Sequence, residues 1–330
     1  LKAEAGRRNA AIERAAAKGR EAAGAEPLPP RPPGFCTGCP ERPIFTALKL
    51  IMRRRGPMHI SMDIGCSTFA TLPPFNMGST VLGYGLSLAS GSAIASHFDQ
   101  PVVAVMGDGG FWHNGLTTGA INAQWQQMDA VLIILENGYA SATGQHHLPS
   151  TGATPVGQPT HISIDRAVRG IGVEWVKHVD SYDLEASMAV IEEALDARDK
   201  GLRVIISDSE CMLARQRRDR TVKAKRLEAG HAVAQEKYGV DAEICTGDHS
   251  CIRLSGCPSL TVKPATDPLK DGPTAHVDNS CAACDLCGSV AQAAQLCPSF
   301  YKASGSVNAN PWQRLKARVN GGLTRLMGAS

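Results

Sequence analysis

The sequence contains no apolar run close to the length, about 18 residues, that a helix needs to cross a bilayer. Its net charge of +3 is small for 330 residues, so it favours neither nucleic acid nor an anionic membrane as a partner. A secretory signal is also missing, because the chain begins with an alanine-rich, charged segment. Since the first residue is Leu1, we expect the chain to be part of a longer polypeptide.

Cysteine, in contrast, is plentiful. Eleven cysteines without a secretory signal indicate a reducing compartment, the cytoplasm, and metal chemistry in place of disulfides. The length allows one large and one small domain with ample core, although the cysteine-rich region has little aliphatic periodicity and must be held together by something other than a core.

The pattern of apolar runs predicts an α/β fold. Strands are expected near residues 102, 131, 173 and 203, and helices over 115–127, 162–170 and 183–199. This alternation predicts a parallel sheet covered by helices on both faces. The small, Gly- and Ser-rich segment 77–97 predicts a buried helix that packs tightly on the sheet.

The same pattern divides the chain into four parts. The predicted domains are a helical segment with a proline-rich linker (1–34), an α/β domain (35–230), a cysteine-rich domain (240–302) and a helical tail (303–330). A disordered tail is the alternative for the first part. Residues 211–230 carry seven Lys or Arg against two acids, which indicates a solvated helix face or a docking patch for an acidic electron carrier or the phosphates of CoA.

Two turns carry the clearest chemical signal. The apolar run Val102–Met106 breaks at Gly107, Asp108, Gly109 and Gly110, and the run Ala130–Leu135 breaks at Asn137. Because the carboxyl ends of parallel strands meet at one edge of a sheet, Asp108 and Asn137 should lie together. Carboxylate and amide oxygens suit Mg²⁺, and the glycines let the backbone approach a diphosphate. A GDG sequence by itself is also typical of a solvated turn.

The pairing of GDG with a later Asn resembles the thiamine diphosphate enzymes. The resemblance implies that Asp108, Asn137 and the carbonyl of Tyr139 hold a Mg²⁺ ion that binds the cofactor's diphosphate, with Gly65 and the three GDGG glycines beside it. The turn ENGYASATGQ resembles the 2-oxoacid:ferredoxin oxidoreductases of this family. His113, His146 and His147 flank the two turns; they are candidates for contact with an oxoacid substrate, or they have ordinary surface roles.

The region from Ile244 to Phe300 resembles a bacterial ferredoxin with two [4Fe-4S] clusters. The resemblance implies one cluster on Cys257, Cys281, Cys284 and Cys287, and a second on Cys245, Cys251 and Cys297. Asp248 stands where the missing ligand of the second set is expected, so that cluster could be Asp-ligated, filled by water, or a [3Fe-4S] form. The gaps before the two Cys-Pro pairs, five and nine residues, also exceed the usual spacing of about three. Zinc is the alternative metal for such thiolates.

Four cysteines remain: Cys36 and Cys39 in CTGC, Cys66 in IGCS and Cys211 in SEC. Their places match those of a proximal [4Fe-4S] cluster in related 2-oxoacid:ferredoxin oxidoreductases, so the resemblance implies a third cluster. The alternative is that they are buried, structural thiols.

The order of these motifs, over residues 34 to 302, resembles the large subunits of the indolepyruvate ferredoxin oxidoreductase family. That implies oxidative decarboxylation of an aryl 2-oxoacid to its acyl-CoA, with electrons passed through the clusters to ferredoxin. The family's pyrimidine-binding domain does not fit into the residues before CTGC, so the remaining part of the large subunit or a partner chain should supply it, and a small subunit is expected as well. Another 2-oxoacid, a non-redox decarboxylase and a pure electron-transfer module remain alternatives.

Overall fold

The structure is a computed structural model that describes residues 2–23, 33–265, 267–270, 272–309 and 312. It divides into two units, residues 1–33 and 34–330. The first unit contains helix α1 (Lys2–Ala23), where the sequence predicted a helix; residues 24–32 of the predicted linker lie outside the described residues. Among the residues described, no helix combines the length and the apolar character needed to cross a membrane.

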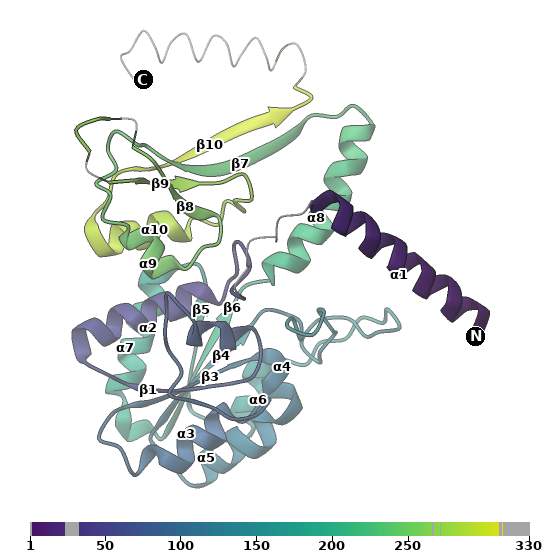
Figure 1. The fold of residues 1–330 in the computed structure, drawn as a ribbon. Coiled ribbons are helices and arrows are strands. Elements are labelled where there is room, and N and C mark those ends of the chain that lie inside the picture. Colours follow the sequence, from purple (N-terminus) through teal and green to yellow (C-terminus); the bar gives the residue numbers. More distant parts are fainter. Residues whose placement is uncertain (1, 24–32, 266, 271, 310–311, 313–330) are drawn as a thin grey trace. The chain divides into compact units, whose positions relative to one another are not determined.

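A six-stranded parallel sheet forms the centre of the second unit, with the order β2-β1-β3-β4-β6-β5 (Figure 1). Its strands are β1 (His59–Met62), β2 (Thr80–Val81), β3 (Val102–Gly107), β4 (Ala130–Glu136), β5 (Trp175–Asp180) and β6 (Leu202–Asp208). Every neighbouring pair runs parallel. The predicted parallel sheet is confirmed.

Helices cover both faces of the sheet (Figure 1). They are α2 (Arg42–Arg55), α3 (Ser87–Ala95), α5 (Ile121–Trp125), α6 (Ile164–Gly170) and α7 (Leu184–Asp196), with short 3₁₀ turns η1 (Cys66–Thr71) and η3 (Arg198–Lys200). The largely exposed helix α8 (Met212–Glu228) follows β6 and leads away from the sheet toward β7 (Val233–Val240) (Figure 1). In β3, Val103 and Val105 belong to a core shared with α2 and α7, whereas Ala104 and Met106 belong to a second core with α3, α5 and α6. Because both faces are buried, the strands read as continuous apolar runs.

Two predicted helices differ from the observed ones. Residues 77–97 form β2 and then α3, because the turn at Gly85 (φ +80°) separates them. The helix expected over 115–127 begins directly after β3, as α4 (Asp108–Gly110), the π-helix η2 (Phe111–Ala120) and α5. The GDGG glycines therefore start a helix, where their missing side chains allow close contacts.

The cysteine-rich region has its own small elements. They are β7 (Val233–Val240), α9 (Ser250–Ser255), β8 (Leu260–Lys263), β9 (Thr274–Val277), α10 (Leu286–Gln295) and β10 (Phe300–Val307). β7 pairs antiparallel with β10, and β8 with β9. The helical tail predicted from residue 303 is wrong at its start, since 303–307 belong to β10. Backbone pairing with β7, with little side-chain burial, forms this strand; residues 313–330 of the predicted tail lie outside the described part.

Hydrogen bonds join the cysteine-rich region to α2. The hydroxyl of buried Thr46 donates to the carbonyl of Leu254 at 2.8 Å, and Nη1 of Arg42 donates to the carbonyl of Ser255 at 2.8 Å. Leu254, Leu286 and Val290 also belong to the core on the α2 side of the sheet. The thiols of this region are therefore held against the α/β domain by apolar packing as well as by hydrogen bonds.

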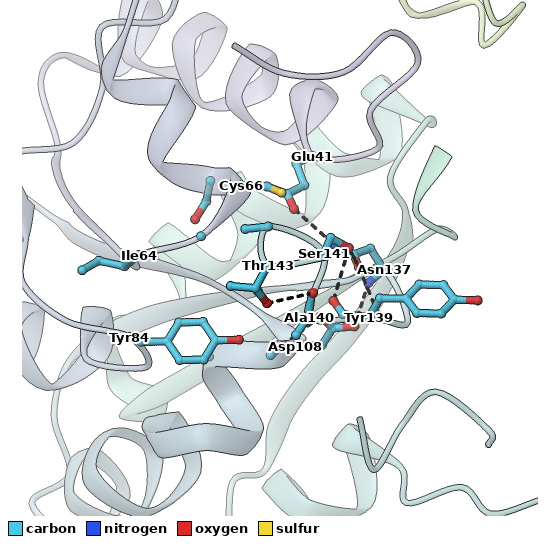
Figure 2. Close-up of a pocket in the computed structure, with 16 residues that line it drawn as sticks. Glu41, Ile64, Cys66, Tyr84, Asp108, Asn137, Tyr139, Ala140, Ser141 and Thr143 are labelled. Atoms are coloured by element: carbon cyan, nitrogen blue, oxygen red, sulfur yellow. Dashed lines mark hydrogen bonds between the residues drawn. The ribbon is translucent and has the colours of Figure 1, made fainter. Parts of the chain in front are cut away.

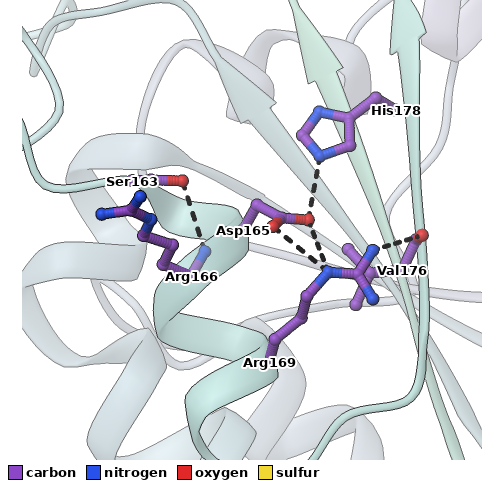
Figure 3. A network of polar contacts seen from close by, with 6 residues as sticks. All are labelled: Ser163, Asp165, Arg166, Arg169, Val176 and His178. Atoms are coloured by element: carbon purple, nitrogen blue, oxygen red, sulfur yellow. Dashed lines mark hydrogen bonds and ion pairs between the residues drawn. The ribbon is translucent and has the colours of Figure 1, made fainter.

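A polar network fixes α6 to β5 at the surface (Figure 3). Asp165 accepts hydrogen bonds from Nε of Arg169 at 3.0 Å and from Nε2 of His178 at 3.1 Å, and Nη2 of Arg169 donates to the carbonyl of Val176. Burial by itself would raise the pKa of Asp165, but the hydrogen bonds from His178 and Arg169 outweigh burial and lower this pKa. These contacts stabilise the packing of α6 against β5.

We predict that Gly85→Ala lowers the free energy of unfolding by more than about 1 kcal/mol. A Cβ at Gly85 would lie 2.5 Å from the carbonyl oxygen of Gly110 and 2.8 Å from the amide nitrogen of Gly115, at a positive φ. Urea denaturation measures the loss. Gly170→Ala is the matched control, because a Cβ there meets nothing and φ is not in the left-handed region; equal effects of the two substitutions would contradict the close approach.

Candidate functional site

One hollow lies at the carboxyl ends of β1, β3 and β4 (Figure 2). It is lined by Glu41 before α2, by Ile64, Gly65, Cys66 and Ser67 after β1, by Tyr84, by Gly107, Asp108, Gly109 and Gly110 after β3, and by Asn137 and residues 139–143 after β4. All the predicted cofactor-binding residues therefore line one hollow.

Asp108 is almost fully buried and joins the ends of two strands. Its Oδ1 accepts from the amide of Gly109 at 2.9 Å, and its Oδ2 accepts from the amides of Asn137 at 3.0 Å and Gly138 at 2.7 Å. Burial raises the pKa of Asp108 to about 7, although the three amide bonds oppose the shift. A bound cation would favour the ionised carboxylate further.

Asn137 presents the second predicted ligand oxygen. Its Oδ1 accepts from the hydroxyl of Ser141 at 2.7 Å and from the amide of Tyr139 at 3.2 Å, and the same hydroxyl lies 3.3 Å from the carbonyl oxygen of Tyr139 (Figure 2). Ser141 thus gathers the two oxygens that the family resemblance assigns to a metal. Ser141 could not be identified from the sequence, because its role depends on the fold of its own loop.

Glu41 is another residue of the hollow that the sequence analysis missed. It is 4% exposed, its Oε1 accepts from Nδ2 of Asn137 at 3.1 Å, and its Oε2 has no partner among the described residues. Burial and then the charge of Asp108 raise the pKa of Glu41 to about 8, although the bond from Asn137 opposes the shift. Glu41 therefore sets the orientation of the Asn137 amide from the other side of the hollow.

The glycines of GDGG leave room for buried polar groups. A Cβ at Gly109 would lie 2.2 Å from the Tyr84 hydroxyl, and one at Gly110 would lie 1.8 Å from Oδ2 of Asp63. Asp63 is 1% exposed; its Oδ1 accepts from the amide of Gly85, and its Oδ2 has no partner in the described structure. Burial raises the pKa of Asp63 to about 6. Hydrogen bonds from the amides of Gly85, Ile64 and Leu86 and the charge of His113 lower the pKa and so reduce this shift.

The candidate histidines lie outside the hollow. His113 is exposed and contacts Tyr84, with 5.0 Å between ring centroids. His146 is also exposed, and its Nε2 lies 2.9 Å from the carbonyl oxygen of Thr143. His147 lies near Tyr139, with 6.5 Å between ring centroids. Their role in binding a substrate stays a prediction.

Four thiols meet beside this hollow. Burial raises the pKa of Cys66, and the charges of Glu41, Cys36 and Cys211 add to the shift. Burial likewise raises the pKa of Cys39, with a further contribution from Cys66. The four thiols therefore lie within electrostatic reach of one another, and Cys66 lines the hollow. In addition, the amide of Cys211 donates to the carbonyl oxygen of Asn137 at 3.0 Å, which ties the thiol group to the GDG site.

The cysteines of the ferredoxin-like sequence gather in the two predicted sets. One hollow is lined by Cys257, Cys281, Cys284 and Cys287, and another by Cys245, Asp248, Cys251 and Cys297. Burial raises the pKa of Cys251 to about 11. The charges of Cys245, Asp248 and Cys297 also raise this pKa, whereas a hydrogen bond from the amide of Ile252 lowers it. No three His, Cys, Asp or Glu side chains in the described ranges are spaced to hold a single metal ion. A four-iron cluster is several ångströms across, so its ligands stand farther apart than those of one ion.

The comparisons with known proteins confirm the resemblance stated from the motifs. Residues 63–207 match the family model of the thiamine pyrophosphate enzyme, C-terminal TPP binding domain. The chain is 33% identical over 288 residues to indolepyruvate oxidoreductase subunit IorA of Thermococcus kodakarensis, and 31% identical over 296 residues to that subunit of Pyrococcus horikoshii. These matches cover 82% and 83% of this chain, and the chain spans 40% of the length of each relative.

Among solved structures, a 2-oxoglutarate:ferredoxin oxidoreductase from Magnetococcus marinus is similar with a TM-score of 0.49 at 18% sequence identity. The match covers 56% of this chain and 66% of that one.

We predict that Asp63→Asn raises the free energy of unfolding at neutral pH. The pKa of Asp63 is higher in the folded protein, about 6, than its ordinary value of 3.8, so the folded state binds this proton more tightly. Protonated Asp63 makes its full contribution to the free energy of unfolding below about pH 4, and this contribution is lost as the pH rises through 6. The advantage of the variant, measured by urea denaturation, should therefore grow between pH 5 and 7.

The matched control is Asp165→Asn. Because the pKa of Asp165 is lowered in the folded protein, its carboxylate contributes stability at neutral pH, and the substitution should lower stability there. Identical pH dependence in wild type and Asp63→Asn would contradict the burial of an unpartnered carboxyl at Asp63.

Proposed function

We propose that this chain is the thiamine-binding and electron-transfer part of a 2-oxoacid oxidoreductase that acts on an aryl 2-oxoacid of the indolepyruvate or phenylpyruvate type. The observation that carries the proposal is the position of Asn137. Its backbone amide donates a hydrogen bond to Oδ2 of Asp108, and its backbone carbonyl oxygen accepts one from the backbone amide of Cys211. The loop at Asn137 therefore contacts both the proposed diphosphate site and the segment that carries Cys211. The names of the curated relatives support the aryl substrate.

The donor set fits a magnesium diphosphate. Asp108, Asn137 and the Tyr139 carbonyl would hold Mg²⁺, and the hydroxyl of Ser141 would release Asn137 Oδ1 to the ion. Gly107, Gly109 and Gly110 line the hollow, and Gly109 and Gly110 let Tyr84 and Asp63 pack closely against its backbone. Thiamine diphosphate supplies, when bound, the electron sink for decarboxylation. The residues of this chain bind and orient it, and Glu41 keeps the Asn137 amide in place.

The thiol sets fit iron–sulfur clusters better than a single ion. We assign one [4Fe-4S] cluster to Cys257, Cys281, Cys284 and Cys287, one to Cys245, Cys251, Cys297 and Asp248, and a third to Cys36, Cys39, Cys66 and Cys211. The grouping of the thiols by mutual electrostatic interaction supports each set. The third set lies beside the thiamine hollow, because Cys66 lines that hollow, and it would be the first to accept electrons.

The complete activity needs more than this chain. The chain spans 40% of its curated relatives, so we propose that the rest of the large subunit or a partner chain supplies the pyrimidine-binding domain. A small subunit, ferredoxin as electron acceptor and CoA as acyl acceptor complete the proposed reaction. The eleven cysteines favour a cytoplasmic location.

We predict that Asp108→Ala abolishes thiamine diphosphate binding and leaves the iron content unchanged. The substitution removes the metal ligand but none of the thiols. Thiamine and iron per chain are measured on the same sample. Asp208→Ala, at the last residue of β6 on the same edge of the sheet, is the control and should retain both; full thiamine retention in Asp108→Ala would remove this residue from the metal site.

We also predict that Asp248→Cys converts a labile cluster into a stable four-iron one. Asp248 lies in the hollow of Cys245, Cys251 and Cys297, and its Oδ2 accepts from the hydroxyl of Ser250 at 2.6 Å. A carboxylate is a harder ligand than a thiolate, so the wild type should lose one iron on mild oxidation. The EPR signal of a [3Fe-4S] cluster should then appear in the wild type and in Asp248→Asn but not in Asp248→Cys. Equal spectra and iron contents in wild type and Asp248→Cys would place Asp248 outside the cluster.

A further inference from the structure

Arg42 is a fully buried charge that has no carboxylate partner among the residues described. It is the first residue of α2 and has 0% exposure. Its Nη1 donates to the carbonyl of Ser255 at 2.8 Å, but Nε and Nη2 have no hydrogen-bond partner in the described structure. Two strong donors and a positive charge are therefore left uncompensated inside the protein.

The other deeply buried arginine of the described residues shows the usual solution. Arg203 is 2% exposed, and its Nη1 lies 2.6 Å from Oδ1 of Asp129, while its Nε donates to the carbonyl of Ala194 at 3.0 Å. Burying an unpaired charge is strongly destabilising, because the charge loses its hydration and gains no partner in return. Arg203 is paired with Asp129, whereas Arg42 has no such partner among the described residues. This difference indicates that a bound anion, which is not part of the polypeptide, balances the charge of Arg42.

The groups around Arg42 identify that anion. Arg42 lines the hollow formed by Cys257, Cys281, Cys284 and Cys287. Its charge also opposes the effect of burial on the pKa of Cys284 in that set, and on those of Cys36 and Cys39 in the set beside the thiamine hollow. One guanidinium therefore lies within electrostatic reach of two thiol sets that come from different parts of the sequence.

We propose that Arg42 is the shared counter-ion of two iron–sulfur clusters, one on Cys257, Cys281, Cys284 and Cys287 and one on Cys36, Cys39, Cys66 and Cys211. The inference rests on the cluster assignment made under the proposed function. A cluster bound by four thiolates is an anion, and its sulfur atoms accept hydrogen bonds from N–H donors. The free Nε and Nη2 donors of Arg42 supply such bonds where no other partner is present.

The position of Arg42 has a redox consequence. A reduced cluster carries one more negative charge than an oxidised one, so a nearby cation stabilises the reduced state more and raises the reduction potential. Because Arg42 reaches both sets, it favours placing an electron on either of them. It does not line the hollow of Cys245, Asp248, Cys251 and Cys297, so that cluster should respond least.

The test is an EPR-monitored redox titration of the purified protein with its partner subunits, comparing wild type, Arg42→Gln and Arg42→Lys. Arg42→Gln keeps a donor for the Ser255 carbonyl but removes the charge, so the potentials of two clusters should shift downward while the third stays unchanged. Arg42→Lys keeps the charge and should shift them less. Arg203→Gln is the matched control for loss of a buried arginine and should leave all three potentials unchanged.

An iron-replete Arg42→Gln protein with wild-type potentials, or with all three shifted equally, would overturn the role of Arg42. If Arg42→Gln does not fold, wild-type protein labelled with ¹⁵N-arginine decides: pulsed EPR of the reduced clusters should detect a weakly coupled guanidinium nitrogen that disappears in Arg42→Lys, and no such coupling overturns the proposal. A wild-type protein without iron would instead overturn the cluster assignment itself, so the two failures are distinguishable.

Discussion

The carboxylate of Asp108 holds the ends of β3 and β4 together by accepting three backbone amides, from Gly109, Asn137 and Gly138. Those bonds fix the loop that carries Asn137, Tyr139 and Ser141, and through the Asn137 carbonyl they also fix the backbone at Cys211. Because the two strands are neighbours in a fully buried sheet, the geometry does not depend on flexible surface loops. Asp108 therefore determines the geometry of the diphosphate site itself, whereas the thiols keep their own positions on other segments.

Four of the buried polar atoms that lack a partner in the described structure belong to charged residues at these sites. Oε2 of Glu41 lies at the wall of the thiamine hollow, Oδ2 of Asp63 lies against Gly110, and Nε and Nη2 of Arg42 lie beside the thiols. Each such atom lowers the stability of the unloaded protein, on the order of 1–3 kcal/mol for a neutral group and more for a charged one. Bound groups that complete these hydrogen bonds would remove this cost, and we infer that the loaded protein is the more stable form.

Much of this arrangement could be predicted from the sequence because the signals are local. Asp108 and Asn137 each follow an apolar run directly, and parallel strands bring such ends to one edge. The resemblance to a ferredoxin placed Cys257, Cys281, Cys284 and Cys287 in one set and Cys245, Cys251 and Cys297 in another, and each set lines one hollow. Glu41 could not be predicted, because its contact with Asn137 joins residues 96 positions apart. The strand β10 was missed because backbone pairing with β7 holds it, and residues 303–307 carry almost no apolar pattern.

We propose that one chain combines a thiamine site with three cluster sites. The decisive measurement quantifies iron, acid-labile sulfide and thiamine together on the purified protein with its partner subunits. We expect one thiamine diphosphate and about eleven to twelve irons per chain, by the four-iron stoichiometry of each cluster and one labile iron near Asp248. About eight irons would contradict a cluster on Cys36, Cys39, Cys66 and Cys211, and a protein with neither iron nor thiamine would contradict the account as a whole.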